Sequence, residues 1–522
     1  MTLLSCSFTS SSFLQRFLRS SWSLAMLARS SSTVVVPNDT NVLPFSAMPG
    51  LKGSIRNILD YAYTKGSFFD VVTERFKRYG PIYSEKILGT QIVNISDVEA
   101  TIKVLRTEKS FQMRPGFEAL EDVGDEVNPG GGIGIASNDY EKWYRQKSLL
   151  SPKLMRPKYV RETLPILNTV ADDFVKRMQR LSERDGTISN LEEELPYCTV
   201  EAMAASLFNQ RLGFYDHPQN PDAVAYVESA KEVVENIGTL SITAPLYKYI
   251  KIPAYYALRK SFLTNIATGM DIINKELAKK QKQQSDSKTE TFFEYLSANE
   301  KVTPKRMALY LTGLMAAGID TTSTTCLWLL YELSRHPEVQ EKVYQEMVSV
   351  LGPDGEVSKT NIQRLSFIKA TLKESGRMNP AGAFVVARVF DKDLDVLGYR
   401  IPAGVYVLLH EHLLSVDQRY YGEDAKKFVP ERWLRDEMGK KNDLNAFTSL
   451  PFGYGVRMCL GRRLAESMIY TLVSKLLLSF RLEYAGDTAV NKDIKDGLMK
   501  PDQPVLVKFI PRKKDTYGLV NV

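Results

Sequence analysis

Cysteine and histidine are scarce in this chain. Its 522 residues include four cysteines and four histidines, with no CxxC and no HExxH motif. These absences exclude a dense disulfide framework, a zinc finger and a histidine-rich metal centre, so that a metal, if bound, would be held by a single cysteine. The chain also lacks any run of 18 apolar residues, which predicts that it has no transmembrane helix.

A strong excess of charge of one sign is also missing. The chain has 68 basic and 61 acidic residues, a formal net charge of +7, and no basic stripe interleaved with aromatic residues. This balance excludes a dedicated nucleic-acid-binding protein. Because hydrophobic residues make up 44% of the chain, we expect a large buried core.

Acidic residues are absent from the first 38 residues, which are rich in serine and contain three arginines. In a helix, the apolar side chains between Phe13 and Leu18 would lie on one face, opposite two of these arginines. This pattern is typical of a mitochondrial transit peptide, and a disordered serine-rich tail is the alternative. We expect residues 1–36 to be the transit peptide and residues 37–522 to form one domain.

Helical patterns dominate the rest of the chain, and strand patterns are confined to two short regions. The helical patterns cover 168–206, 262–284, 303–334 and 462–480, and the strand patterns cover 82–95 and 387–409. The sequence therefore predicts a mainly α protein with small β-sheets, in the α+β class.

The interior of the predicted helix at 303–334 is unusual. Gly318 costs about 1 kcal/mol in a helix relative to alanine, and the polar Asp320 and Thr321 follow it. One explanation is that Gly318 lets a flat ligand approach the backbone, while the Thr321 hydroxyl binds a backbone carbonyl and opens a widened turn. Tight packing of small residues at a helix crossing is the alternative.

Residues 452–461 read FGYGVRMCLG and precede a strong apolar helix. The glycines permit a tight loop, and the helix N-terminus after Cys459 would stabilise a thiolate, while Arg457 could pair with an acidic ligand group. This arrangement suits an axial thiolate on haem iron. A buried, unreactive cysteine is the alternative. At average residue usage, however, six fixed positions of this string match a chain of this length by chance roughly five times in a million.

The string resembles the haem-binding signature of the cytochrome P450 superfamily, and the resemblance extends over nearly the whole chain after the presequence. It implies haem b as cofactor, bound by Cys459 between a long distal I helix and the L helix. Residues 374–377 (ESGR) resemble the E-x-x-R pair of the family's K helix, and residues 428–433 (FVPERW) resemble its later meander. The resemblance thus implies a buried cluster that supports the haem side of the Cys459 loop. Its members are Glu374, Arg377 and Arg432, which as isolated pairs would be ordinary surface ion pairs.

The resemblance also implies residues that contact the haem and act on oxygen. The predicted haem contacts are Trp143, Lys147, Arg388, Phe452, Arg457 and Gly461. Lys147 stands where the family usually has arginine, so Arg145 is the alternative propionate ligand. Gly318, Asp320 and Thr321 resemble the oxygen-activating motif, in which Asp320 relays protons and Thr321 hydrogen-bonds the oxygen molecule.

Lys369 and Lys373 lie one helical turn apart, and mitochondrial members of the family show such a basic pair. The pair implies docking of an acidic two-iron ferredoxin that receives electrons from an NADPH-dependent reductase; a solvated helix face is the alternative. Residues 246–256 mix aromatic residues with lysine, which suits a membrane surface or, alternatively, a helix joint. With the presequence, these features predict a location on the matrix side of the inner mitochondrial membrane.

The predicted substrate contacts are small or apolar, which implies a lipophilic substrate. They are Met315, Ala317, Ala381, Ala383, Phe384 and Val385, together with Gly318 and Thr321. Sterol, secosteroid, ecdysteroid-like and xenobiotic substrates fit equally well. The resemblance therefore implies a monooxygenase that inserts one atom of O₂ into such a substrate. A haem-thiolate isomerase or peroxygenase and a haem-binding sensor without turnover are the alternatives.

Overall fold

The structure is a computed structural model, and it describes most of residues 42–512. The segments outside the description are 1–41, 64–67, 88, 108–110, 114–116, 131, 138, 184, 209–210, 216–219, 243–246, 248–250, 283–289, 353–354, 383–385, 436–443, 445, 496–497 and 513–522. The predicted transit peptide, residues 1–36, therefore lies outside the described residues, and so do the predicted substrate contacts Ala383, Phe384 and Val385.

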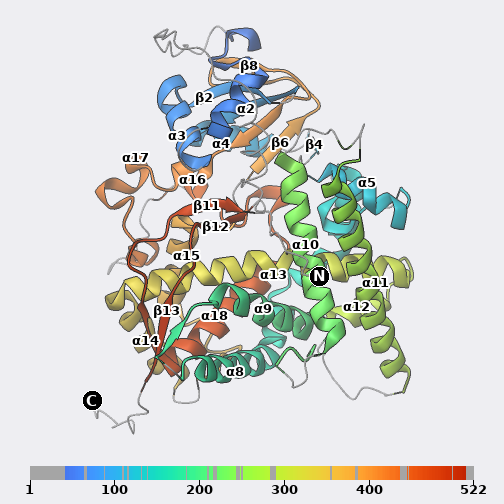
Figure 1. Ribbon diagram of the computed structural model, residues 1–522, viewed down its shortest axis with the longest axis vertical. Helices are drawn as coiled ribbons and strands as arrows, with labels where there is room; N and C mark the ends of the chain where they lie inside the picture. The colour runs from blue at the N-terminus through green and yellow to red at the C-terminus, as the bar shows by residue number, and fades with distance from the viewer. Residues whose placement is uncertain are drawn as a thin grey trace, which may run out of the picture.

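Helices form most of the fold, as the sequence predicts (Figure 1). The helices are α2 (Ser54–Tyr63), α3 (Phe68–Tyr79), α4 (Val98–Arg106), α5 (Glu118–Val127), α6 (Tyr140–Leu154), α7 (Pro157–Glu162), α8 (Leu164–Leu181), α9 (Leu191–Phe208), α10 (Pro221–Ile242), α11 (Pro253–Lys282), α12 (Phe292–Ser297), α13 (Pro304–Arg335), α14 (Pro337–Leu351), α15 (Ser366–Met378), α16 (Glu411–Leu414), α17 (Gln418–Tyr421) and α18 (Arg462–Ser479).

The strands are short and form small sheets. They are β1 (Gly50–Leu51), β2 (Ile82–Ile87), β3 (Thr90–Ile95), β4 (Phe111–Met113), β5 (Thr187–Ile188), β6 (Val386–Phe390), β7 (Leu394–Val396), β8 (Tyr399–Ile401), β9 (Tyr406–Leu409), β10 (Phe480–Tyr484), β11 (Lys492–Lys495), β12 (Leu498–Pro501) and β13 (Val507–Pro511). The largest sheet has the order β1-β2-β3-β9-β6-β4, and it brings together the two predicted strand regions, 82–95 and 387–409. Within it, β3 and β9 are parallel, whereas β2 pairs with β3 and β6 with β9 in antiparallel register.

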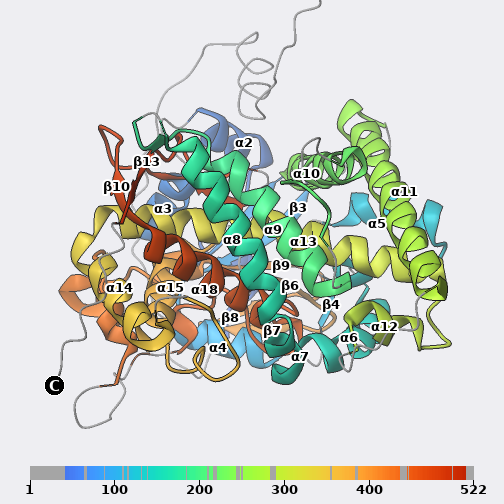
Figure 2. The same cartoon turned by 90° about the horizontal axis from the view of Figure 1, so that it is seen from below.

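The long helix α13 runs through the helical part of the molecule, with α8, α9 and α18 below it in Figure 1; seen from below in Figure 2, α8 and α9 cross in front of it. It begins as predicted, because the Thr303 side chain accepts a hydrogen bond from the Arg306 N–H and Pro304 occupies the first helical position. Its middle belongs to the largest hydrophobic core, which also contains residues of α8, α9 and α18.

The predicted helix at 168–206 is wrong in one respect, because the structure divides this region into α8 and α9. Between them, Gly186 adopts a φ of +82°, a left-handed conformation that ends a helix easily only at glycine. Thr187 and Ile188 then pair with Lys508 and Val507 of β13. The pairing with a distant C-terminal strand interrupts the helical pattern, and local periodicity gives no sign of it.

Candidate functional site

The loop before α18 has the shape that its glycines permit. Gly453 and Gly455 adopt φ values of +69° and +74°, which side chains with a Cβ rarely tolerate. The Cys459 N–H donates a 2.9 Å hydrogen bond to the Phe452 carbonyl oxygen and closes the loop. Gly461 is the N-cap of α18, so Cys459 stands just before the positive end of this helix, where a thiolate is stabilised.

Exposure separates Cys459 from the other described cysteines. Cys459 is exposed and forms no disulfide, whereas Cys198 and Cys326 are buried. Burial raises the pKa of the Cys326 thiol to about 12 and raises that of Cys198 further, with a smaller contribution from Cys326. Because only a thiolate is a strong ligand or nucleophile, Cys459 is the cysteine suited to the chemistry predicted from its motif.

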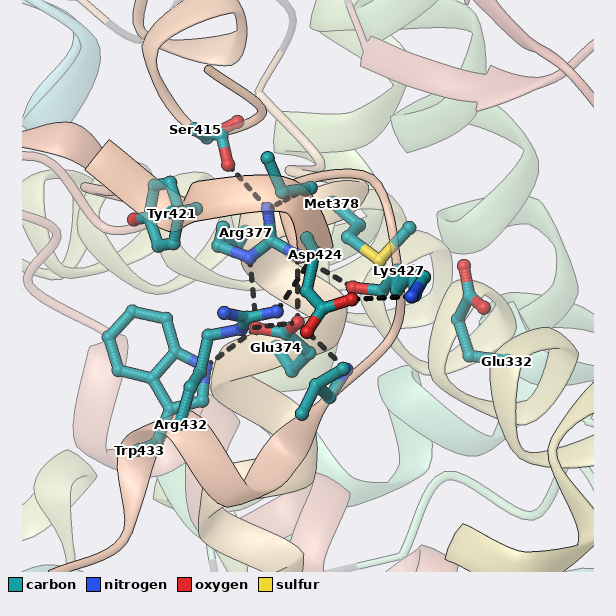
Figure 3. A network of polar contacts seen from close by, with 12 residues as sticks. Glu332, Glu374, Arg377, Met378, Ser415, Tyr421, Asp424, Lys427, Arg432 and Trp433 are labelled. Atoms are coloured by element: carbon teal, nitrogen blue, oxygen red, sulfur yellow. Dashed lines mark hydrogen bonds and ion pairs between the residues drawn. The ribbon is translucent and has the colours of Figure 1, made fainter. Parts of the chain in front are cut away.

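The Glu374 carboxylate is the centre of a buried polar network (Figure 3). It accepts two hydrogen bonds from the Arg377 guanidinium, at 2.9 and 2.7 Å, and one from Arg432 Nε at 2.9 Å. The Trp433 indole N–H and the Val429 N–H donate two more. Glu374 and Arg377 have 0% exposed side-chain surface, so the predicted cluster is present and is a buried ion pair rather than a surface one.

The remaining Arg377 donors tie the network to the chain that follows. Its Nη1 donates to the carbonyl oxygens of Ser415 and Ala425, and its Nη2 donates to that of Lys427. The ring of Tyr421 lies 4.7 Å from the Arg377 guanidinium, within cation–π range. These contacts fix the meander between α16 and the Cys459 loop against α15.

Gly376, which lies between Glu374 and Arg377 on α15, makes a second link to the loop. A Cβ atom at this position would lie 3.4 Å from Pro451 Cβ, at the upper limit of a tight contact. Helix α15 therefore packs directly against the residue that precedes the 452–461 motif. Neither Gly376 nor Pro451 was predicted to make this contact, although the proline immediately before the motif fixes the backbone that leads into the loop.

The middle of α13 exposes one stripe of small side chains. Ala317 and Thr321 are exposed, while most of the helix around them is buried. The Thr321 hydroxyl donates a 2.7 Å hydrogen bond to the Ala317 carbonyl oxygen, as predicted, but the helix stays α-helical throughout. The expected widened turn is therefore absent from α13, because the hydroxyl adds to the helical hydrogen bonds without opening a turn. Asp320 is buried, with 8% of its surface exposed.

Two other predicted residues of α13, Gly318 and Met315, pack against neighbouring parts of the protein. A Cβ atom on Gly318 would lie 2.8 Å from the sulfur and methyl group of Met203 on α9, so Gly318 permits a close helix crossing. Of the two explanations for this glycine, helix packing is the one that this contact supports. Met315 is 1% exposed and belongs to the main core, so it does not lie on the exposed stripe. In a helix, Met315 lies about 120–160° around the axis from positions 317 and 321, whereas Gly318 lies only about 60° from Thr321, as its i, i+3 neighbour.

Two cationic side chains, Arg457 and Lys147, lie against the ring of Trp143, which is buried on α6. The Arg457 guanidinium lies 3.9 Å from the Trp143 ring, and it donates to the Ser137 carbonyl oxygen at 3.2 Å. Lys147 Nζ lies 5.0 Å from the same ring and donates to the Val456 carbonyl oxygen. Arg145, the alternative to Lys147, is 81% exposed and pairs with Glu141, so it points away from this group.

The segment before α6 connects the Cys459 loop to the distal helix. Ser137 accepts the Arg457 hydrogen bond, and a Cβ on nearby Gly134 would lie 3.5 Å from the Leu309 carbonyl oxygen of α13. The Gly134 to Ser137 segment was not identified from the sequence. Arg388, the third predicted cation, is buried on β6 and donates to its neighbour's carbonyl oxygen, Ala387 O.

The predicted ferredoxin pair lies on α15, beside the Glu374 network. Lys373 is exposed, with its Nζ 6.0 Å from the Trp433 ring, and Lys369 is half-buried and donates to the Gln363 carbonyl oxygen. The pKa of Lys369 is lowered, mainly because of burial and to a smaller extent because of Lys373. The carboxylates of Glu346 and Glu466 act in the opposite direction. Because Glu466 belongs to α18, Lys369 lies within electrostatic range of the helix that follows Cys459.

Other predictions fall on partly described segments. Ala381 is half-buried, and its carbonyl oxygen accepts a hydrogen bond from Met499 N–H. In the predicted membrane segment, Tyr247 and Tyr255 are buried and stack at 5.7 Å, with Lys251 Nζ 3.8 Å from the Tyr255 ring. Tyr256 is 59% exposed. Within the residues that the structure describes, no helix combines the length and the hydrophobicity that a membrane span requires.

Comparison with known proteins places the whole site in one family. The sequence profile of the family "Cytochrome P450" matches residues 52–509, which includes α15, the Glu374 network and the Cys459 loop. The chain is a cytochrome P450. The resemblance predicted from its motifs is thereby confirmed, as is the mainly α fold with small sheets.

The relatives of this cytochrome P450 include mitochondrial enzymes. It is 29% identical to "Cytochrome P450 10" of Lymnaea stagnalis, over 94% of this chain and 90% of the relative. It is 27% identical to the mitochondrial "1,25-dihydroxyvitamin D(3) 24-hydroxylase" of Rattus norvegicus, over 85% and 84%. It is also 27% identical to the mitochondrial "Cholesterol side-chain cleavage enzyme" of Capra hircus, over 85% and 84%.

Membership of the P450 monooxygenase family makes this protein an oxidoreductase with haem b as cofactor, bound through a cysteine thiolate. The residues present fit this group. An exposed thiol before a helix N-terminus supplies the soft anionic ligand that haem iron takes in this family. The cations Arg457 and Lys147, which meet at Trp143, suit the carboxylates at the porphyrin edge.

Proposed function

We propose that this cytochrome P450 is a mitochondrial monooxygenase that hydroxylates a lipophilic substrate with electrons from a two-iron ferredoxin. The observation that supports the electron donor is the basic pair Lys369 and Lys373 on α15, near Glu466 of α18. An acidic protein that docks here would meet the side of the molecule that carries the Cys459 loop. The mitochondrial enzymes among the relatives support the compartment, and so does the acid-free presequence, residues 1–36.

Cys459 is the proposed axial ligand of the haem iron. The backbone of Phe452 and Gly461 brackets it, and the loop hydrogen bond between Cys459 N–H and Phe452 O keeps the thiol in place. The Glu374 network with Arg377 and Arg432 supports this loop through α15. When bound, the haem supplies the electron-accepting iron at which dioxygen is reduced.

The proposed propionate ligands are Arg457, Lys147 and Arg388, with Trp143 as the platform against which the first two pack. The observed hydrogen-bond acceptors of these side chains include backbone carbonyl oxygens, which carry no negative charge. A carboxylate is a stronger partner for a guanidinium or an ammonium group than a carbonyl. Because Arg145 pairs with Glu141 at the surface, Lys147 is the better candidate.

On the distal side, we propose that Thr321 and Asp320 take part in proton transfer. The Thr321 hydroxyl is exposed on α13 and donates to Ala317 O, so its oxygen can accept a hydrogen bond from a reacting group or water. Asp320 is adjacent and 8% exposed, and its carboxylate would relay protons from solvent toward Thr321. Gly318 has no chemical role in this proposal, because it serves the α9 crossing.

The proposed substrate is a sterol- or secosteroid-like molecule. Two relatives, a 1,25-dihydroxyvitamin D(3) 24-hydroxylase and a cholesterol side-chain cleavage enzyme, support this class. Ala317 on α13 and Ala381 after α15 are small residues that leave room for a bulky apolar ligand. Ala383, Phe384 and Val385 complete the proposed contacts.

We propose that the protein lies on the matrix side of the inner mitochondrial membrane. The exposed ring of Tyr256 and the lysine Lys251 lie at the start of α11, and such a pair suits the lipid headgroup region. A lipophilic substrate that partitions into the membrane would then reach the protein from the bilayer.

Reconstitution tests the proposed electron donor. The haem-loaded protein is combined with a two-iron ferredoxin, its NADPH-dependent reductase and a panel of sterols and secosteroids, and NADPH consumption and hydroxylated product are followed together. We expect ferredoxin-dependent product and a reduction rate that falls as salt rises, because charge-guided docking is screened. The double variant Lys369→Glu with Lys373→Glu should slow reduction strongly.

The matched control is the double variant Lys301→Glu with Lys305→Glu, which changes the net charge by the same amount. These exposed lysines are also four residues apart, but they lie near the start of α13, far from α15 in Figure 1. Reduction that is salt-insensitive, or that both double variants slow equally, would contradict the docking face. Product formed without reductant would instead indicate a peroxygenase or isomerase, and haem binding without any turnover would indicate a sensor.

A further inference from the structure

A small cavity lies among the four helices α8, α9, α13 and α18, which sit side by side in both views (Figures 1 and 2). Its volume is about 20 Å³. It is an interior space, because every residue that lines it is buried. A cavity needs roughly 10–15 Å³ to hold one water molecule, so this one has room for a single small molecule.

The lining of the cavity is poor in groups that could hold water or an ion. Most of it consists of aliphatic side chains, and its polar members are two threonines and two cysteines. The Thr199 hydroxyl is directed to the carbonyl oxygens of Pro196 and Ile319, at 3.0 and 3.3 Å. The thiols of Cys198 and Cys326 are uncharged, because burial raises the pKa of both, and a thiol is a weak hydrogen-bond donor.

The occupant favoured by this chemistry is an apolar molecule of one or two atoms. A buried water needs two to four good polar partners, and apolar cavities of this kind stay dry and accept xenon or other apolar guests. The thiols and the Met468 thioether, which also lines the space, are polarisable and favour dispersion contact with such a guest. The shape of the cavity, rather than a hydrogen bond, would select the guest.

The position of the cavity connects it to the reaction. Thr322 lines it and directly follows Thr321, the proposed proton-handling residue on α13. Met468 belongs to α18, the helix that begins just after Cys459. The cavity thus lies between the two helices that carry the proposed distal and proximal groups of the site, on the side where α13 packs against α9.

We propose that this four-helix cavity binds one molecule of a small apolar gas, and that it holds dioxygen during turnover. The first part depends only on the described side chains, and the second rests on the proposed monooxygenase function. A dioxygen molecule held beside Thr322 would raise the local concentration of the gaseous substrate next to the reaction site. No covalent step is involved, since the gas enters and leaves unchanged.

Xenon is the probe for the gas site, applied under pressure to crystals of the haem-loaded protein. We expect xenon density between α8, α9, α13 and α18 in the unaltered protein. Ala171→Val adds two methyl groups to the cavity lining and should abolish it, whereas Cys326→Ala removes a sulfur atom and should increase it. The control Ala204→Val adds the same two groups at a fully buried position of α9 outside the lining, and should leave xenon bound.

Steady-state turnover at varied oxygen concentration tests the second part. Ala171→Val should raise KM for dioxygen several-fold and leave kcat at saturating oxygen unchanged, while Ala204→Val should change neither. Absence of xenon from the unaltered, haem-loaded protein would overturn the gas site. Xenon binding with an unaltered KM in Ala171→Val would overturn the dioxygen role. If ferredoxin supports no turnover at all, the proposed function and the dioxygen role fail together, whereas the xenon result still decides the gas site.

Discussion

Replacement of Glu374 by alanine tests whether the buried network supports the Cys459 loop. Glu374 accepts five hydrogen bonds, two from Arg377 and one each from Arg432, Trp433 and Val429. The substitution leaves all five donors without this acceptor at a site that solvent does not reach. The largest consequence falls on Arg377, whose side chain is fully buried and cannot lose its charge.

The cost follows from the burial of this ion pair. Removing one partner of a buried pair costs about 3–5 kcal/mol, because the remaining charge stays desolvated and uncompensated. A typical folded domain is stable by about 5–15 kcal/mol, so the loss is a large fraction of the total. Because Gly376 packs against Pro451, relaxation of α15 would also displace the loop that begins there. We therefore expect Glu374→Ala to lose haem as well as stability.

Urea unfolding of the purified variant and its haem content per polypeptide measure these two effects. Asp395→Ala is the control, since Asp395 also binds an arginine, Arg400, through two hydrogen bonds of 2.9 and 3.1 Å, but at an exposed site. That variant should keep its haem and most of its stability, because exposed pairs are screened by water. Normal haem content in Glu374→Ala would refute the reasoning.

Three further outcomes are expected. Cys459→Ser should abolish the reduced carbon monoxide spectrum of a thiolate-ligated haem, which Cys326→Ser should retain; an unchanged spectrum in Cys459→Ser would exclude it as ligand. Thr321→Ala should consume NADPH with less hydroxylated product, and a product ratio equal to that of the unaltered protein would contradict its proposed role. Burial lowers the pKa of His410 to about 3, from 6.5 in the unfolded chain. The unfolded state therefore takes up a proton that the folded state does not, and stability should fall as pH drops below about 6.5. His410→Gln should reduce this fall in the free energy of unfolding between about pH 7 and pH 5, as measured by urea unfolding. An identical pH dependence in the variant and the unaltered protein would contradict the assignment.

Where local sequence determines geometry, prediction succeeded. The cap at Thr303, the left-handed loop glycines and the Glu374 to Arg377 spacing each depend on residues within a few positions of one another. The three signals were visible because the chain's own short-range geometry requires these residue types. The predicted burial of the ion network needed the additional information that residues 428–433 recur in the family.

Where the partner is distant in the sequence, prediction failed. The close approach of Gly318 to Met203 joins α13 to α9, more than 100 residues earlier, and the break after α8 is set by pairing with β13, more than 300 residues later. Met315 is apolar and close to Thr321, but the helix turns it into the core. The hydrogen bond between Ser137 and Arg457 also joins segments about 320 residues apart, and no periodic pattern in the sequence predicts it.

The Glu374 network and the Gly376 contact consist entirely of groups from the polypeptide. Helix α15, the meander and Pro451 can therefore assemble before any cofactor arrives. For the mitochondrial location proposed above, an order of events follows. The cysteine loop can be in place first, and haem insertion then becomes the docking of a ligand onto a prepared surface, so that the apoprotein has a folded form on which cofactor delivery can act.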